Sequence, residues 1–131
     1  FHKTYHYTAV ELDEAVLYLA QKYTLPQLSS SIETICTDAY AYVLQSEQQY
    51  DMICMDVFLD DSIPEQFQTV SYLQALKQRL SPNGTLLYNC LAAKPKDVAA
   101  TQNFYETQFA QVFPNGTYLD VEGNWILVNR I

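Results

Sequence analysis

Acidic residues follow three segments of this chain that have the composition of buried β-strands. Glu11 and Asp13 come after the first segment, Asp38 after the second, and Asp56 at the exit of the third. In open parallel sheets, ligands bind beyond the carboxyl ends of the strands. A carboxylate accepts two hydrogen bonds, so one acid could hold a ribose diol and another could accept from the exocyclic amine of a base. One such acid is usually a helix cap or a solvated loop residue, but three at one edge favour a site for a nucleoside-like ligand.

The strands that would position these acids alternate with helices along the chain. Hydrophobic periodicity predicts strands at residues 5–12, 32–37, 52–57 and 85–91. It predicts helices at residues 13–23, 39–46 and 97–113, and another marked by Leu73, Leu76 and Leu80 and closed by the turn sequence "SPNG". Residues 116–131 read as two strands around a short reversal at residues 122–124. The pattern predicts one α/β domain over residues 1–131, with a mostly parallel sheet, helices on both faces and a C-terminal antiparallel hairpin.

The composition of the chain limits the kinds of molecule that it is expected to bind. The chain has 131 residues and a formal net charge of −8, so its surface would repel nucleic acid and attract a cationic substrate. No apolar run approaches the roughly 18 residues that a membrane-spanning helix needs, so no membrane partner is expected. Cys36, Cys54 and Cys90 form no C-x-x-C pair, which favours buried reduced thiols in a cytoplasmic protein and gives no support to a metal site.

Three blocks of sequence resemble a known family. They are "YTAVELDEAVLYLAQKY", "TDAYAYV" and "YDMICMDVFLDDSIPEQFQTVSYLQALKQRLSPNGTLLYN". They are similar to blocks of the spermidine synthase-like family, within the class I S-adenosylmethionine-dependent methyltransferase superfamily. The resemblance covers about residues 5–90. The third block is the most specific, because its spacing from Asp56 to Tyr72 matches the family without a gap.

The resemblance implies a Rossmann-like fold and a role for several residues. Glu11 would bind the ribose hydroxyls, and Asp38 with the backbone of Ala39 would recognise adenine. Asp56 would hold the amine nucleophile and remove its proton. Asp13 is expected to cap a helix. Tyr72 is as compatible with the core as with the wall of a substrate pocket.

The sequence departs from the family pattern in the loop after Asp56. The family usually carries a second Asp three residues later, in a D-x-x-D-P block, where this chain has Leu59. Asp60 and Asp61 follow, and they could either replace the missing acid in substrate binding or be solvated charges. The leucine puts the diamine specificity in doubt and leaves the adenosyl part of the interpretation intact.

A second departure concerns the start of the chain. The three glycines lie in predicted turns, so no G-x-G loop is present, and the superfamily's first strand and glycine-rich loop would precede Tyr5. Phe1 and His2 would end the helix between them, so we expect the chain to be a fragment or to be missing its beginning. Without the missing strand, the strands at 5–12 and 52–57 would have open edges. We expect those strands to pair directly, a neighbouring chain to fill the gap, or upstream residues to fill it.

The resemblance implies aminopropyl transfer from decarboxylated S-adenosylmethionine to a small amine, without a metal, in a possible homodimer. Leu59 favours an alternative, methyl transfer from S-adenosylmethionine itself. A third hypothesis is a degenerate, non-catalytic domain of the same fold. The 131-residue chain alone is expected to be inactive and to bind an adenosyl ligand weakly.

Overall fold

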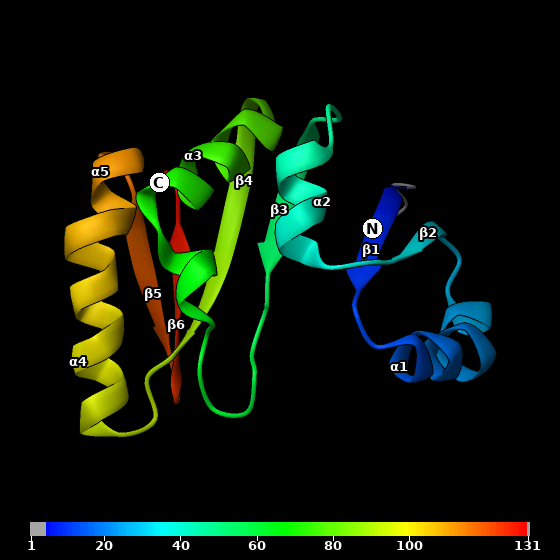
Figure 1. Cartoon of the computed structure of the whole chain (residues 1–131), viewed down its shortest axis with the longest axis horizontal. Coiled ribbons are helices and arrows are strands. Elements are labelled where there is room, and N and C mark those ends of the chain that lie inside the picture. The colour runs from blue at the N-terminus through cyan, green and yellow to red at the C-terminus, as the bar shows by residue number, and fades with distance from the viewer. Residues whose placement is uncertain (1–4, 131) are drawn as a thin grey trace. The chain divides into compact units, whose positions relative to one another are not determined.

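The computed structural model describes residues 5–130, and the contacts within the chain divide it into two compact units, residues 1–45 and 46–131 (Figure 1). Each unit is described by itself. The first contains β1 (His6–Glu11), α1 (Glu14–Leu19), η1 (Ala20–Thr24), η2 (Leu25–Gln27), β2 (Ser31–Cys36) and α2 (Ala39–Gln45). The second contains β3 (Tyr50–Met55), η3 (Glu65–Gln68), α3 (Val70–Arg79), β4 (Leu80–Leu91), α4 (Pro95–Phe104), η4 (Tyr105–Phe109), α5 (Ala110–Val112), β5 (Thr117–Val121) and β6 (Asn124–Val128). The expected helix end at Phe1 and His2 lies outside the described residues.

The first unit is built on one parallel pair of strands. β1 and β2 run side by side from His6, opposite Ser31, to Glu11, opposite Cys36. The chain leaves β1 through a helix cap, as predicted. The carboxylate of Asp13 accepts hydrogen bonds from the backbone N–H groups of Ala15 and Val16, at 2.8 and 3.3 Å, which satisfies two donors at the start of α1.

The second unit is a four-stranded sheet in the order β3-β4-β6-β5. β3 and β4 are parallel, whereas β6 pairs antiparallel with both β4 and β5. This confirms the predicted C-terminal hairpin. Its turn contains Gly123 with φ +86, a conformation that glycine adopts without steric cost.

One face of the four-stranded sheet carries the core. The side chains of Leu86, Tyr88 and Cys90 alternate along β4 and are at most 1% exposed. Helices α3, α4 and α5 pack over this face (Figure 1). Aromatic contacts join the layers, among them Tyr88 against Phe104 at 5.4 Å between ring centroids. The α/β class of the prediction is therefore confirmed, with its core in the second unit.

The opposite face of the same sheet is less covered. Leu87, Asn89 and Leu91 of β4 are half-buried, and Met52 of β3 is 59% exposed. Helices were expected on both faces, but the helices of residues 46–130 that contact this sheet lie on the core face. Asn89 thus sits on a surface that solvent can reach.

The sequence predicted one mostly parallel sheet, and the described strands form two. β1 pairs with β2, β3 pairs with β4, and no described strand joins the pairs. Direct pairing of the first and third strands, one of the three arrangements expected for their open edges, is therefore not what the described strands adopt. The other two ways of covering the open edges stay predictions.

Two local predictions also need correction. "SPNG" was expected to be a turn, but residues 81–84 belong to β4, where Asn83 has φ 66 and the β3–β4 register shifts. The helix expected from Asp97 begins at Pro95. A proline suits the first turn of a helix because it lacks an N–H group. The carboxylate of Asp97 then accepts a hydrogen bond from the backbone N–H of Lys94 at 3.0 Å.

Cysteine burial also differs from the prediction. Only Cys90 is buried, whereas Cys36 and Cys54 are exposed. Cys36 is the last residue of β2, and Cys54 lies on the less covered face of the second sheet.

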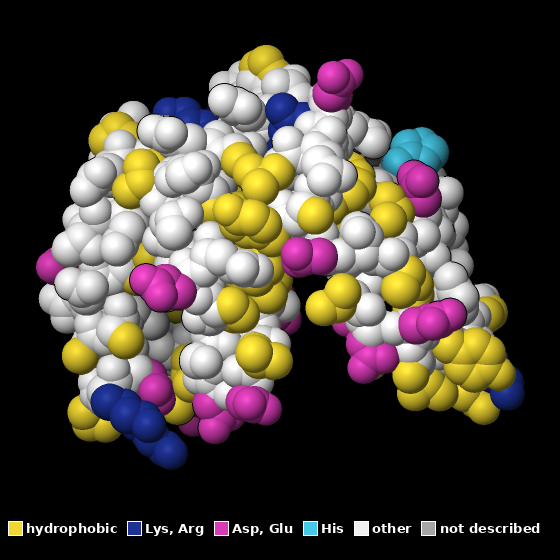
Figure 2. All heavy atoms as spheres, viewed as in Figure 1, with side chains coloured by type: hydrophobic (Ala, Val, Ile, Leu, Met, Phe, Trp, Pro, Cys, Tyr) yellow, Lys and Arg dark blue, Asp and Glu magenta, His cyan; other side chains and the backbone are white. Residues whose placement is uncertain are grey.

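The surface of the described residues mixes acidic and apolar side chains (Figure 2). Val16, Tyr18 and Leu19 in the first unit are each at least half exposed. Among residues 5–130, no helix has the length and apolar character needed to cross a membrane.

Candidate functional site

Glu11 and Asp38 lie at one edge of the two-stranded sheet. Glu11 is the last residue of β1 and stands opposite Cys36, the last residue of β2. The backbone N–H of Thr37 donates to the carbonyl of Glu11 at 3.1 Å, so the strands stay paired up to the residue before Asp38. Because the two strands are parallel, both carboxylates project from the carboxyl-terminal edge. This placement of the two acids was predicted from the sequence.

Local hydrogen bonds orient both carboxylates. Glu11 Oε1 accepts from the backbone N–H of Asp13 at 2.9 Å, and Asp38 Oδ1 accepts from the backbone N–H of Tyr40 at 3.0 Å. Both acids are half-buried. Each carboxylate uses one oxygen to shape the exit of its strand, and acceptor capacity remains for a ligand that presents hydroxyl or amine donors.

Asp56 follows β3 in the second unit, so the third predicted acid belongs to the other sheet. Its side chain is exposed, and its Oδ1 accepts a hydrogen bond from Asn89 Nδ2 at 3.0 Å. Asn89 Oδ1 in turn accepts from Asn124 Nδ2 at 2.8 Å. Neither asparagine was predicted from the sequence, because a lone Asn in an apolar strand has no periodic or motif signal. Their place opposite an acidic strand exit becomes visible only when the strands are paired.

The loop after Asp56 leaves its acids in solvent. A single bridge joins Leu59 and Ser62, with backbone hydrogen bonds of 2.8 and 3.2 Å. Asp60 has φ 54, and both Asp60 and Asp61 are exposed. Leu59, which stands where the family usually has its second Asp, is 67% exposed and has no charge with which to hold an ammonium group. The substrate role of Asp60 and Asp61 stays a prediction.

Tyr72 lies in the core. It is 1% exposed, its hydroxyl lies 3.6 Å from Met55 Sδ, and its ring meets Phe67 edge to face at 5.2 Å. This favours the first of the two roles considered for Tyr72. Its neighbour Tyr88 donates from its hydroxyl to the carbonyl of Phe67 at 2.8 Å.

Burial raises the pKa values of two core groups. Removal from water lifts the pKa of the Tyr88 hydroxyl far above its ordinary value, and the nearby Cys90 and Tyr72 add to this. Burial also raises the pKa of the Cys90 thiol from 9.0 to about 12. Both groups are therefore neutral at physiological pH and do not supply a nucleophile.

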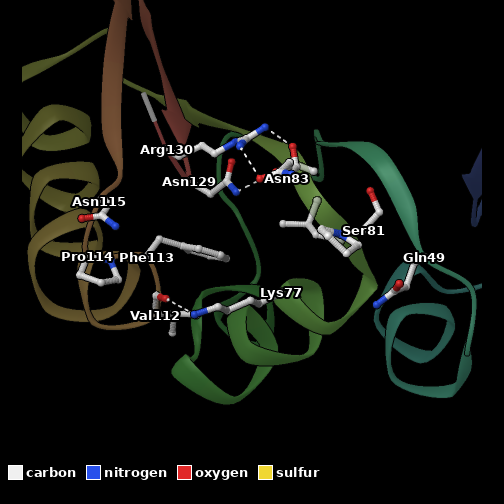
Figure 3. Close-up of a pocket in the computed structure, with 13 residues that line it drawn as sticks. Gln49, Lys77, Ser81, Asn83, Val112, Phe113, Pro114, Asn115, Asn129 and Arg130 are labelled. Carbon is white, nitrogen blue, oxygen red and sulfur yellow. Dashed lines mark hydrogen bonds between the residues drawn. The ribbon is translucent and has the colours of Figure 1, made fainter.

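A pocket of about 490 Å³ opens at the N-terminal end of β4, away from the end that carries Asn89 (Figure 3). Its lining includes Lys77, Asn83, Asn129 and Arg130, and it includes no acid predicted for the site. Lys77 Nζ donates to the carbonyl of Val112 at 3.2 Å, and the Arg130 guanidinium donates to the carbonyl of Asn83. Asn129 accepts from the backbone N–H of Leu86 at 2.8 Å and donates to the carbonyl of Gly84 at 3.1 Å. These hydrogen bonds link the ends of strands and helices in the second unit.

The sequence model of the spermine/spermidine synthase domain matches residues 1–121, which is most of the chain. The chain belongs to this family. A polyamine aminopropyltransferase of Vibrio vulnificus is 34% identical over 87 residues, an alignment that covers 64% of this chain and 29% of that protein. The chain therefore spans less than a third of the length of this relative.

Solved structures share the fold of this family member. Human methyltransferase-like protein 13, in complex with SAH, superposes with a TM-score of 0.78 and 24% identity over 95% of this chain and 60% of that one. A probable spermidine synthase of Corynebacterium glutamicum gives a TM-score of 0.77 and 23% identity over 92% of this chain and 46% of that one. At these identities the likeness establishes the Rossmann-like fold.

Proposed function

We propose that this chain is part of an enzyme that transfers an aminopropyl group from decarboxylated S-adenosylmethionine to a small amine. The observation that carries the proposal is the pair Glu11 and Asp38 at the carboxyl ends of two paired parallel strands. Membership of the spermine/spermidine synthase family and the aminopropyltransferase relative support it. The relatives with solved structures include one in complex with SAH, which supports an adenosyl ligand.

The acids have distinct roles in this proposal. Glu11 accepts hydrogen bonds from the ribose hydroxyls, and Asp38, with the backbone of Ala39, binds the adenine. The net charge of −8 favours both reactants, because the donor is a sulfonium cation and the acceptor is an ammonium cation before reaction.

Asp56 acts on the acceptor amine. Its carboxylate orients the ammonium group and accepts one of its protons, which frees the nitrogen lone pair. The nitrogen attacks the aminopropyl carbon next to sulfur, so a C–N bond forms while the C–S bond breaks. The bonding electrons stay on sulfur, and the neutral thioether leaves.

A donor-swap assay tests the reaction. The native protein that contains this chain is incubated with putrescine and either decarboxylated or ordinary S-adenosylmethionine, and products are identified by mass. We expect an aminopropylated amine from the decarboxylated donor. A methylated product from the ordinary donor, with no aminopropyl product, would replace the proposal with methyl transfer.

Substitutions test the residues. Glu11→Gln removes a charged acceptor and is expected to weaken binding of the adenosyl donor by about tenfold or more. Glu33→Gln is the matched control, because Glu33 is an exposed acid in the middle of β2. Equal donor affinity for both variants in calorimetry would remove Glu11 from the site.

Methyl transfer is the second candidate, and one observation favours it. Leu59 stands 67% exposed where the family usually has the second acid that would hold a diamine. A methyl acceptor needs no second ammonium contact. Restoring the acid with Leu59→Asp separates the two candidates, since it is expected to lower the KM for putrescine only in an aminopropyltransferase.

A further inference from the structure

Three side chains form a hydrogen-bonded row that ends at the candidate base. Asn124 Nδ2 donates to Asn89 Oδ1 at 2.8 Å, and Asn89 Nδ2 donates to Asp56 Oδ1 at 3.0 Å. The row runs from the half-buried Asn124 to the exposed Asp56. It lies within the second unit and joins β4 and β6 to the residue that follows β3.

Strand register places the three residues together. Met55 pairs with Tyr88 in the parallel β3–β4 ladder, so the next residues, Asp56 and Asn89, become neighbours. In the antiparallel β4–β6 ladder, Asn124 pairs with Leu91, two residues from Asn89 and therefore on the same face. Tyr88 and Cys90 point to the buried face, so this alternation leaves Asn89 on the face that solvent can reach.

The hydrogen bonds of the row can be donated in only one order, from Asn124 to Asn89 and from Asn89 to Asp56. An ionised carboxylate can only accept hydrogen bonds, so Asn89 must turn its NH₂ group toward Asp56. The carbonyl oxygen of Asn89 then faces Asn124, which must donate. Asn124 therefore stops the Asn89 amide from rotating, and Asn89 fixes Oδ1 of Asp56.

We propose that Asn89 and Asn124 are positioning residues for Asp56, an inference that rests on the proposed function. Holding Oδ1 in place orients the second oxygen, Oδ2, toward the amine. A carboxylate on an exposed strand exit would otherwise sample several rotamers, and small misplacements of a reacting group are costly to rate. The row gives Asp56 a fixed orientation without burying it.

Kinetics of the native protein that contains this chain test the proposal. Asn89→Leu keeps the approximate volume and removes the donor, so we expect kcat to fall by about ten- to a hundredfold. The KM of the adenosyl donor should change by less than about threefold, because Glu11 and Asp38 are untouched. Asn103→Leu, at an exposed position of α4, is the control and should leave both constants unchanged.

Asn124→Asp tests the direction of the row. A carboxylate at position 124 can only accept, so the Asn89 amide would rotate and present its oxygen to Asp56. We expect kcat to fall as far as in Asn89→Leu, with the thermal midpoint close to that of the native protein. Native kcat in both variants would overturn the positioning role.

A double-mutant cycle separates this inference from the proposed function. If Asn89 acts through Asp56, Asn89→Leu should lower kcat in the native background and by less than about twofold when added to Asp56→Asn. An equal loss in both backgrounds would overturn the positioning role and leave Asp56 as the base. Full activity of Asp56→Asn alone would instead overturn the role of Asp56 and, with it, the inference.

Discussion

At the scale of single residues, the same strand carries chemistry on one face and core on the other. Asn89 faces the candidate base, while Tyr88 and Cys90 on either side of it are at most 1% exposed. Substitutions of the buried neighbours are therefore expected to change stability, whereas substitution of Asn89 is expected to change turnover. The contributions of Tyr88 and Cys90 to stability are therefore independent of the proposed activity.

The buried thiol of Cys90 predicts alkaline sensitivity. Burial raises its pKa from 9.0 to about 12, so the folded state favours the neutral thiol. Its contribution to stability is present below about pH 9 and is lost as the pH rises toward 12. Above pH 9 the free energy of unfolding should fall more steeply in the native protein than in Cys90→Ala, by up to about 1.4 kcal/mol per pH unit. Parallel slopes in denaturant titrations would contradict this.

The Tyr88 hydroxyl predicts a second stability effect. Tyr88→Phe removes the 2.8 Å hydrogen bond to the carbonyl of Phe67 in the core, and we expect a loss of about 1–2 kcal/mol in the free energy of unfolding. Tyr105→Phe is the control, because that hydroxyl donates to Gly116 at 3.1 Å in a half-buried position. The control should lose less than Tyr88→Phe in urea unfolding.

At the scale of elements, the pairing of parallel strands determines which polar side chains lie next to one another. Glu11 and Asp38 lie at the same edge because Glu11 of β1 pairs with Cys36 of β2. Asp56 lies beside Asn89 because Met55 of β3 pairs with Tyr88 of β4. The C-terminal hairpin completes the second group, since β6 brings Asn124 beside β4. The geometry of the hairpin turn thus bears on the position of Asn124.

Gly123 in that turn is expected to resist substitution. Its φ of +86 is strained for a residue with a Cβ. The space around it is open, because a Cβ added there would lie 4.0 Å from its nearest neighbour, Ala93 Cβ. Gly123→Ala should therefore cost about 1 kcal/mol through the backbone alone. Gly123→Asn should cost less, because Asn tolerates this region. Equal thermal midpoints for the two variants would show that the turn relaxes.

The sequence predicted where the strands lie better than it predicted which strands pair with one another. Alternating apolar residues located all six strands to within a few residues, except that β4 begins earlier, at Leu80. The strand ends of Glu11 and Asp38 followed from the same pattern. Pairing between strands distant in sequence leaves no periodic signal, so Asn89 and Asn124 could not be found. The exposure of Cys36 and Cys54 was missed for a similar reason, because apolar runs do not reveal which faces lack a covering helix.

At the scale of the whole molecule, the core lies in one of the two units. Every buried residue in the described range 5–130 lies from Met55 onward, and β1 and β2 contain none. Local stability rises with buried apolar contacts, so the two units should open with different free energies. The candidate nucleoside-binding acids thus lie on the less buried unit.

Hydrogen exchange should reveal this asymmetry. Amides of β4 and β6 are expected to exchange at least about tenfold more slowly than those of β1 and β2, because their sheet carries the core. An adenosyl ligand should slow exchange in β1 and β2 if Glu11 and Asp38 bind it. Exchange measured by mass spectrometry with and without the ligand tests both statements. Uniform protection along the chain would contradict the first.

The chain contains a single tryptophan, Trp125. Its indole stacks on the Tyr118 ring, with 4.0 Å between the ring centroids and an angle of 6° between the ring planes. It directly follows Asn124, so its intrinsic fluorescence reports on the hairpin that carries this asparagine. Emission from this one ring can therefore follow opening of the hairpin in real time, with no label attached.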